Sequence, residues 1–245
     1  MRLHYTLAGS GPLAIALTHG LAASEATWAA QVPALVTRHR VLTWDLRGHG
    51  RSGTAPAPCT PADLAADLRG VLDRAGRERA VILGHSAGGV VAMQLALDSP
   101  ERVAGLVLVG TASECNARAR QFYQDLASIA EERGIEPVRK RLGVSAEQAR
   151  EAPIHAATFA SVARAMARLH TEPLTPRLGE IRCPTLVIVG ERDALGVGGS
   201  VIIQRSIAGA RLEIVPERGH GIFVEDPAGF NALVLEFLAA LVRSA

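Results

Sequence analysis

A serine stands in a sequence pattern that suits nucleophilic chemistry. Residues 84–88 read GHSAG, and the apolar run Ala80 to Leu83 comes directly before them. Because a helical stretch follows, the pattern predicts a tight turn from a strand into a helix with Ser86 at its tip. Amide groups at the start of that helix, that of Ala87 first, can stabilise the anion that forms when a hydroxyl attacks a carbonyl.

Nucleotide binding is the other function that a glycine-rich turn of this kind can serve. A nucleotide-binding turn would show GxGxxG or GKS/GKT directly after a strand. Residues 48–53 (GHGRSG) match the first pattern but do not directly follow a strand-like run, and GKS/GKT does not occur in the chain. The serine therefore favours acyl transfer.

A serine hydroxyl is a weak nucleophile at neutral pH and needs a general base. Of the eight histidines, His220 lies between two glycines a few residues after the strand-like run Leu212 to Val215. We therefore predict that His220 is the base. The remaining histidines outside glycine-rich motifs follow no late strand: they are His4, His39, His155 and His170.

The base needs a carboxylate that fixes its tautomer and stabilises its charged form. Asp193 and Glu191 both follow the strand-like run Thr185 to Val189. Asp193 is favoured because the later residue of the turn should lie nearer the histidine loop. The other place for such an acid is after the run Leu106 to Val109, where residues 110–112 read GTA and offer no carboxylate.

The elements that must position these residues alternate between strands and helices. Continuous apolar strands of this kind predict a mostly parallel sheet with helices on both faces. Thr60 and Pro61 predict the start of a helix, as do Asp226 and Pro227. The expected strands of the sheet are Val41 to Trp44, Ala80 to Leu83, Leu106 to Val109, Thr185 to Val189 and Leu212 to Val215.

The amino-terminal segment predicts two further elements. Residues 3–7 alternate, residues 13–17 are apolar, and glycines separate them, so they are expected to pair as an antiparallel hairpin. Trp28, Val32, Leu35 and Val36 recur at the spacing of one helical face. Trp28 and Trp44 both sit in apolar patterns, so core packing is expected for them rather than a place in a pocket.

From about Glu114 to Pro173 the chain shows helical spacing and no strand-like run. This segment is interpreted as an insertion in one domain. The predicted organisation is a core of residues 1–113 and 174–245, with residues 114–173 as a helical cap.

Several motifs together resemble the α/β-hydrolase family over nearly the whole chain. Residues 19–21 (HGL) resemble its oxyanion loop, residues 45–52 (DLRGHGRS) its DxRGxGxS segment, and residues 84–89 its GHSxGG motif. The order Ser86, Asp193, His220 is also that of the family. One departure lies after Asp193, where ALGVGG stands and the family often continues to a proline.

The resemblance implies a fold and several roles. The fold would be an α/β-hydrolase fold: a mostly parallel twisted sheet with helices on both faces and a helical cap insertion. The amide of Leu21 would be the second oxyanion donor beside that of Ala87. His19, His49 and His85 would form buried hydrogen bonds that hold loops around the site.

The function we expect is cleavage of a small carboxylic ester or lactone through an acyl-enzyme on Ser86, with no cofactor and no metal. This resembles small esterases and 3-oxoadipate enol-lactonases. Other chemistries of the fold stay open: carbon–carbon bond hydrolysis, aminopeptidase, thioesterase or cofactor-free lyase activity, and a slow-turnover ligand-binding receptor.

The composition limits which classes of partner and which cellular compartment are expected. The 245 residues carry a net charge of +2 without a run of one sign, which argues against nucleic acid and membrane surfaces and leaves small molecules. Three scattered cysteines suggest neither disulfides nor zinc. The run Leu13 to Leu17 is too short for a signal peptide and Ala232 to Val242 too short for a membrane span, so a cytoplasmic location is expected. The oligomeric state stays open.

Overall fold

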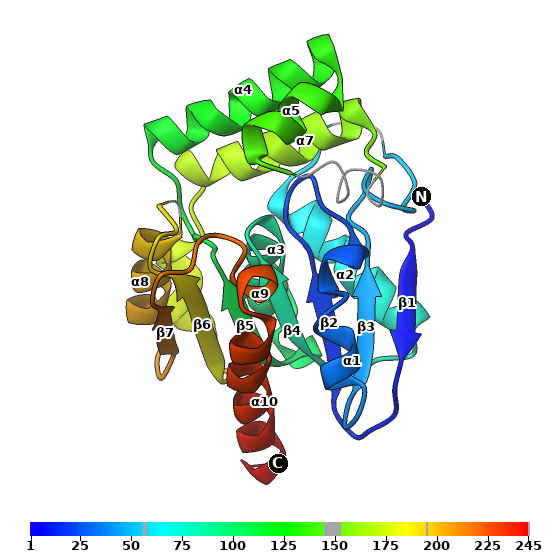
Figure 1. The fold of residues 1–245 in the computed structure, drawn as a ribbon, viewed down its shortest axis with the longest axis vertical. Helices are drawn as coiled ribbons and strands as arrows, with labels where there is room; N and C mark the ends of the chain where they lie inside the picture. Colours follow the sequence, from blue (N-terminus) through cyan, green and yellow to red (C-terminus); the bar gives the residue numbers. More distant parts are fainter. Residues whose placement is uncertain (56–57, 145–152, 195, 245) are drawn as a thin grey trace.

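The computed structural model describes residues 1–55, 58–144, 153–194 and 196–244. Its centre is a seven-stranded sheet with strand order β1-β3-β2-β4-β5-β6-β7, in which only β1 runs antiparallel to its neighbour (Figure 1). The mostly parallel sheet predicted from the sequence is therefore confirmed. The strands are β1 (Tyr5–Ala8), β2 (Ala14–Thr18), β3 (Arg40–Trp44), β4 (Ala80–His85), β5 (Val103–Val109), β6 (Thr185–Gly190) and β7 (Arg211–Val215).

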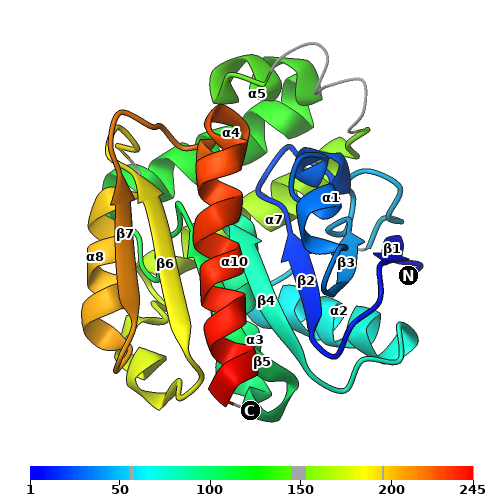
Figure 2. The ribbon, with the colours of Figure 1, turned by 60° about the horizontal axis from the view of Figure 1, so that its bottom comes forward.

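Helices cover both faces of the sheet, as the apolar strands predicted. Alternate residues of β2 point to opposite faces, so Ala16 joins one core cluster and Ile15 and Leu17 join the other. Figure 2 shows α10 lying along one face with α3 behind the sheet. The first cluster includes residues of α2 (Pro61–Arg74), α3 (Ala87–Asp98) and α8 (Val197–Ser206), and the second includes residues of α1 (Val32–Leu35), α9 (Ile222–Glu225) and α10 (Pro227–Ser244).

The predicted amino-terminal hairpin is wrong. β1 pairs antiparallel with β3, and β2 lies between β3 and β4, parallel to both. The burial of the two strands explains the arrangement: every residue of β2 is buried, whereas the ends of β1 are half-buried and its middle is exposed. A strand that is apolar on both faces gains most from a central position, so the partly exposed strand takes the edge.

The single helical face predicted over residues 28–36 is also only partly right. The chain forms a 3-10 turn, η1 (Glu25–Trp28), and then the one-turn helix α1. Trp28 and Leu35 are nevertheless buried against the same face of the sheet. Trp44 is buried in the other cluster, so core packing is confirmed for both tryptophans.

Two predicted helix starts agree with the structure. The Thr60 hydroxyl accepts a hydrogen bond from the amide of Asp63 at 3.2 Å, and the Asp63 carboxylate accepts one from the amide of Thr60 at 2.8 Å. Asp226 caps α10 by accepting from the amide of Gly229 at 3.0 Å. Each cap satisfies backbone N–H groups that the first turn of a helix leaves without partners.

Three helices of the predicted insertion lie over one end of the sheet (Figure 1). They are α4 (Ala117–Arg133), α5 (Ile135–Leu142) and α7 (Ala156–Ala167). Their apolar side chains form a third cluster together with Ala22, from the loop that follows β2. The helices therefore cover the carboxyl end of that strand. The division into residues 1–113 and 174–245 with a cap of residues 114–173 stays a prediction.

In residues 1–55, 58–144, 153–194 and 196–244, the other regular segments that the structure shows are 3-10 turns. In the part of the chain that the structure describes, no helix combines the length and the apolar character that crossing a bilayer requires. The turns are η2 (Pro100–Arg102), η3 (Arg168–His170) and η4 (Thr175–Glu180).

Candidate active site

Ser86 lies on a sharp turn between β4 and α3. Its φ of 53° and ψ of −117° are strained for a residue with a side chain. The glycines around it are needed because the backbone passes so close: a Cβ on Gly84 would lie 2.2 Å from the carbonyl oxygen of Gly88, and one on Gly88 would lie 2.3 Å from that of Thr18. The GxSxG spacing thus makes the turn sterically possible.

Backbone hydrogen bonds hold Ser86 from two sides. Its N–H donates to the carbonyl oxygen of Val109 at 2.9 Å. Its own carbonyl oxygen accepts from the Thr111 hydroxyl at 2.7 Å and from the amide of Gly89 at 2.9 Å. The end of β5 and the start of α3 therefore both fix the serine backbone.

Asp193 and His220 form a direct pair. His220 Nδ1 lies 2.8 Å from Asp193 Oδ2, where the carboxylate accepts the ring N–H. Asp193 is 3% exposed, and its other oxygen accepts from the amide of Gly196 at 3.0 Å. Glu191 is exposed and instead accepts from the amide of Glu217 at 3.0 Å. The structure brings the later acid of the turn to the histidine.

The turn that follows β5 places Ser86 beside this pair. A Cβ on Gly110 would lie 2.9 Å from Asp193 Oδ2 and 3.2 Å from His220 Nδ1, while the preceding residue, Val109, bonds to Ser86. In addition, the His85 ring lies against that of His220, with 4.6 Å between centroids. Among the described residues, no hydrogen bond joins the Ser86 hydroxyl to His220, a separation common in enzymes without substrate.

The loop after β2 approaches the serine from another side. A Cβ on Gly20 would lie 3.2 Å from Ser86 Cβ. His19 Nδ1 donates to the carbonyl oxygen of Gly20 at 2.7 Å, so the N–H of Leu21, in the same planar peptide, points away from His19. Neither the N–H of Leu21 nor that of Ala87 donates to another group in the described ranges. Both amides are thus available for an anion.

Three histidines form hydrogen bonds around the site: His19 and His49 are buried, and His85 is half-buried. His19 Nε2 accepts the N–H of Leu46 at 3.0 Å, and His49 Nδ1 donates to the carbonyl oxygen of Arg47 at 3.0 Å. His85 Nε2 donates to the carbonyl oxygen of His220 at 3.1 Å. Burial lowers the pKa of His19 to about 4 and of His49 to about 3, and it holds the pKa of His85 well below its usual range. These imidazoles are neutral at pH 7.

Two side chains that support the site carried no signal in the sequence analysis. Thr111 bonds to the Ser86 carbonyl, and Glu225 accepts from the amide of Gly219, next to His220, at 2.7 Å. The Thr111 contact joins residues 25 positions apart, whereas the Glu225 contact spans only six positions. The position of Thr111 after an apolar strand was the only available hint, because it places the residue at the same edge of the sheet as Ser86.

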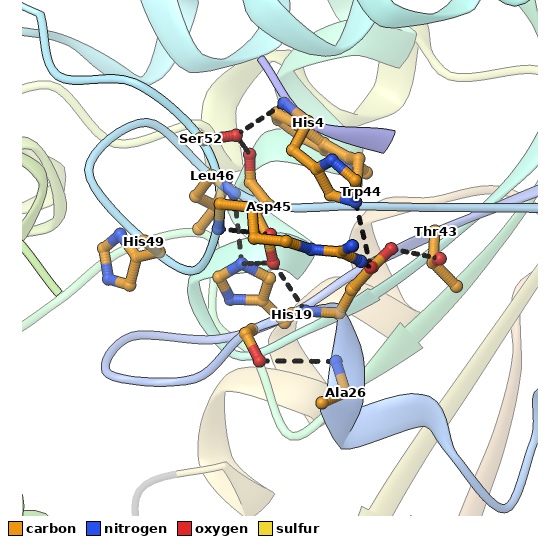
Figure 3. A network of polar contacts seen from close by, with 12 residues as sticks. His4, His19, Ala26, Thr43, Trp44, Asp45, Leu46, His49 and Ser52 are labelled. Carbon is orange, nitrogen blue, oxygen red and sulfur yellow. Dashed lines mark hydrogen bonds and ion pairs between the residues drawn. The ribbon is translucent and has the colours of Figure 1, made fainter. Parts of the chain in front are cut away.

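One cluster has side chains that could bind a metal, but hydrogen bonds within the protein already engage it. Ligand atoms of His4, Glu25 and Asp45 lie within 4.8 Å of one another (Figure 3). The Asp45 carboxylate accepts from the amides of Glu25 at 2.7 Å and Arg51 at 2.8 Å. The Arg51 guanidinium pairs with Glu25 and supplies the positive charge. The cluster fits a support for the loop at residues 45–52.

Comparisons with known proteins agree with this architecture. The model of the "Alpha/beta hydrolase family" matches residues 15–233. A relative from Variovorax paradoxus, named "Putative carbamate hydrolase RutD", is 33% identical over 98% of this chain and 97% of its own. The enol-lactonase structure from Burkholderia xenovorans is 28% identical, with a TM-score of 0.85 over 97% of this chain and 96% of that one. A thermophilic esterase from Thermogutta terrifontis is 26% identical, with a TM-score of 0.88 over 98% and 93% of the two chains.

The strand order, the helices on both faces and the matched family model agree with one another. The family model covers far more than half of the chain, and the Variovorax relative matches almost all of it. The chain belongs to the alpha/beta hydrolase family.

Proposed function

We propose that Ser86, His220 and Asp193 form a catalytic triad that cleaves a small carboxylic ester or lactone. One observation carries the proposal. The strained Ser86 is hydrogen-bonded to Val109 at the end of β5, and the next residue, Gly110, packs against His220 and its buried partner Asp193. A nucleophile, a base and an orienting acid at one edge of a sheet are the set that acyl transfer requires.

The reaction proceeds in two steps. His220 donates its Nδ1 proton to Asp193, so its Nε2 is the basic atom that takes the proton from the Ser86 hydroxyl. The serine oxygen attacks the substrate carbonyl, and the N–H groups of Leu21 and Ala87 stabilise the oxyanion. The alcohol leaves with the proton from His220. Water, activated by the same base, then releases the acid from Ser86.

Two of the similar structures, an enol-lactonase and an esterase, support an oxygen leaving group. The substrate is a small molecule, and the steps use only groups of this chain. The remaining chemistries of the fold use the same nucleophile on a thioester, an amide or a carbon–carbon bond.

A carbamate is the second candidate substrate. The Variovorax relative, named as a carbamate hydrolase, matches this chain over nearly its whole length. The carbonyl of a carbamate would meet the same serine and the same two amides. Its acyl intermediate would be a carbamoyl ester of Ser86, which water must also cleave.

A substrate panel tests the proposal. Purified enzyme is compared with Ser86→Ala by kcat/KM on short-chain esters, lactones, carbamates, thioesters and amides, and both proteins are treated with a fluorophosphonate. Multiple turnover on esters or lactones, lost in Ser86→Ala, together with labelling at Ser86, supports the proposal. If kcat/KM is highest on a carbamate, the carbamate replaces the ester or lactone as the proposed substrate. Unchanged hydrolysis by Ser86→Ala contradicts the nucleophile, and a single burst without turnover favours a receptor.

A further inference from the structure

The turn that ends β5 contacts all three residues of the proposed triad. The carbonyl oxygen of Val109 accepts the Ser86 N–H at 2.9 Å, and the Thr111 hydroxyl donates to the Ser86 carbonyl at 2.7 Å. Between them, Gly110 packs against Asp193 and His220. Consecutive residues of one turn therefore connect the nucleophile to the acid–base pair.

Gly110 allows the turn after β5 to lie close to the Asp193 carboxylate. Its φ is 52°, and a side-chain Cβ there would lie 2.9 Å from Asp193 Oδ2. Its N–H donates to the carbonyl oxygen of Ile188 at 3.0 Å, which ties the turn to β6, the strand that leads to Asp193. Only a glycine allows the backbone to follow this path so close to the carboxylate.

Thr111 connects the same turn to Ser86 and to the start of α3. Thr111 is 3% exposed and packs against Gly89 in the first turn of α3. A Cβ added to Gly89 would lie 2.6 Å from the Cβ of Thr111. The Ser86 carbonyl already accepts the amide of Gly89 at 2.9 Å, so the start of the helix leaves this oxygen satisfied without the threonine. The additional hydrogen bond from the Thr111 hydroxyl therefore holds the Ser86 carbonyl toward the turn after β5.

We propose that Thr111 is a positioning residue, whose hydroxyl holds the Ser86 backbone so that the serine oxygen comes within reach of His220. The inference rests on the proposed function. Among the described residues, the hydrogen bonds that reach the strained Ser86 backbone from outside α3 come from the Val109 carbonyl and the Thr111 hydroxyl, both in the same turn. Loss of the hydroxyl lets the serine relax away from the base, which slows its deprotonation.

The test compares Thr111→Val, which removes the hydroxyl and keeps the shape, with Thr111→Ser, which keeps the hydroxyl. Thr185→Val is the matched control: Thr185 is also 3% exposed and donates to a backbone carbonyl, that of Cys183 at 3.1 Å, but it begins β6 at the opposite end of the sheet. Active sites are titrated with a fluorophosphonate. Turnover of 4-nitrophenyl acetate is then expressed per titrated site, so that loss of folded protein does not count as loss of rate.

We expect kcat per site to fall on the order of tenfold or more in Thr111→Val, with KM unchanged, because the contact acts on the reacting oxygen rather than on substrate binding. The rate of fluorophosphonate labelling should fall by the same factor. Thr111→Ser should restore both rates, and Thr185→Val should leave both at the level of the native enzyme.

A Thr111→Val enzyme with native kcat and labelling rate overturns the inference and leaves the proposed function standing. If the valine variant does not fold, Thr111→Ser is compared with Thr111→Ala, and equal rates per site overturn the inference. A native enzyme that neither hydrolyses the ester nor reacts with the fluorophosphonate contradicts the proposed function itself, and the role of Thr111 falls with it.

Discussion

The Asp193 carboxylate and the His220 imidazole differ sharply in exposure although they touch. The side chain of Asp193 is 2% exposed and that of His220 is 40% exposed, with 2.8 Å between Oδ2 and Nδ1. The buried partner fixes the ring from behind, while the other edge of the ring stays open. A histidine that must exchange protons with substrate and water needs this arrangement, because only the far nitrogen can do so.

Asp193→Asn should reduce kcat by roughly a thousandfold to ten thousandfold, because an amide in this place can favour the wrong tautomer of His220. The measurement is ester hydrolysis per folded enzyme. Glu191→Gln is the matched control: this acid lies two residues away, and its carboxylate accepts from the amide of Glu217 rather than from His220, so the activity of the variant should stay at the native level. Near-native kcat in Asp193→Asn would remove Asp193 from the triad.

Two helical glycines should respond to alanine in opposite directions. In Gly88→Ala the new Cβ would meet the Thr18 carbonyl oxygen at 2.3 Å, so α3 must move from the sheet, and we expect a loss of about 2 kcal/mol in unfolding free energy. Gly70 lies in α2, and its Cβ would meet only the end of Arg74 at 3.5 Å. Gly70→Ala should therefore gain roughly 0.5–1 kcal/mol. Urea unfolding measures both, and equal signs would contradict the close packing of α3.

Thr60→Ala removes one half of the reciprocal cap of α2. The amide of Asp63 then loses its acceptor, and the expected cost is about 1 kcal/mol of unfolding free energy. Thr60→Ser keeps the hydroxyl and serves as the control in the same urea titration. A Thr60→Ala protein as stable as Thr60→Ser would show that the cap contributes nothing measurable.

Stability should fall as the pH drops from about 6.5 toward 4. Burial lowers the pKa of His19 to about 4 and that of His49 to about 3, below the ordinary histidine value of 6.5. In this range the unfolded chain binds protons that the folded chain does not, so unfolding becomes easier. For His19 alone, full titration corresponds to a loss of about 3 kcal/mol.

Urea unfolding at a series of pH values from 7.5 to 4.5 measures this dependence. His49→Gln should give a shallower slope because one buried imidazole with a lowered pKa is gone. An unfolding free energy that stays constant or rises on acidification would show that these histidines are not buried in neutral form.

The local sequence determined much of the candidate site. The turn around Ser86 is a local feature, because the strained φ and the close approaches at Gly84 and Gly88 arise from a few neighbouring residues. The starts of α2 and α10 likewise depend on caps that bond within three residues. Apolar runs identified the central strands because burial on both faces leaves a continuous pattern.

Only the tertiary structure decided the relations between distant segments. The spacing of residues 3–17 is compatible with a hairpin. The strand that pairs with β1 instead depends on which strand buries most apolar surface at the centre of the sheet, and this involves all the strands. The role proposed for Thr111 depends on a hydrogen bond to a residue 25 positions away, which leaves no periodic pattern in the sequence. Steric contacts within a turn and helix caps depend on neighbouring residues, so the sequence predicts them. The proximity of Ser86, Thr111, Asp193 and His220 instead depends on the order of the parallel strands, and packing of the whole core determines that order.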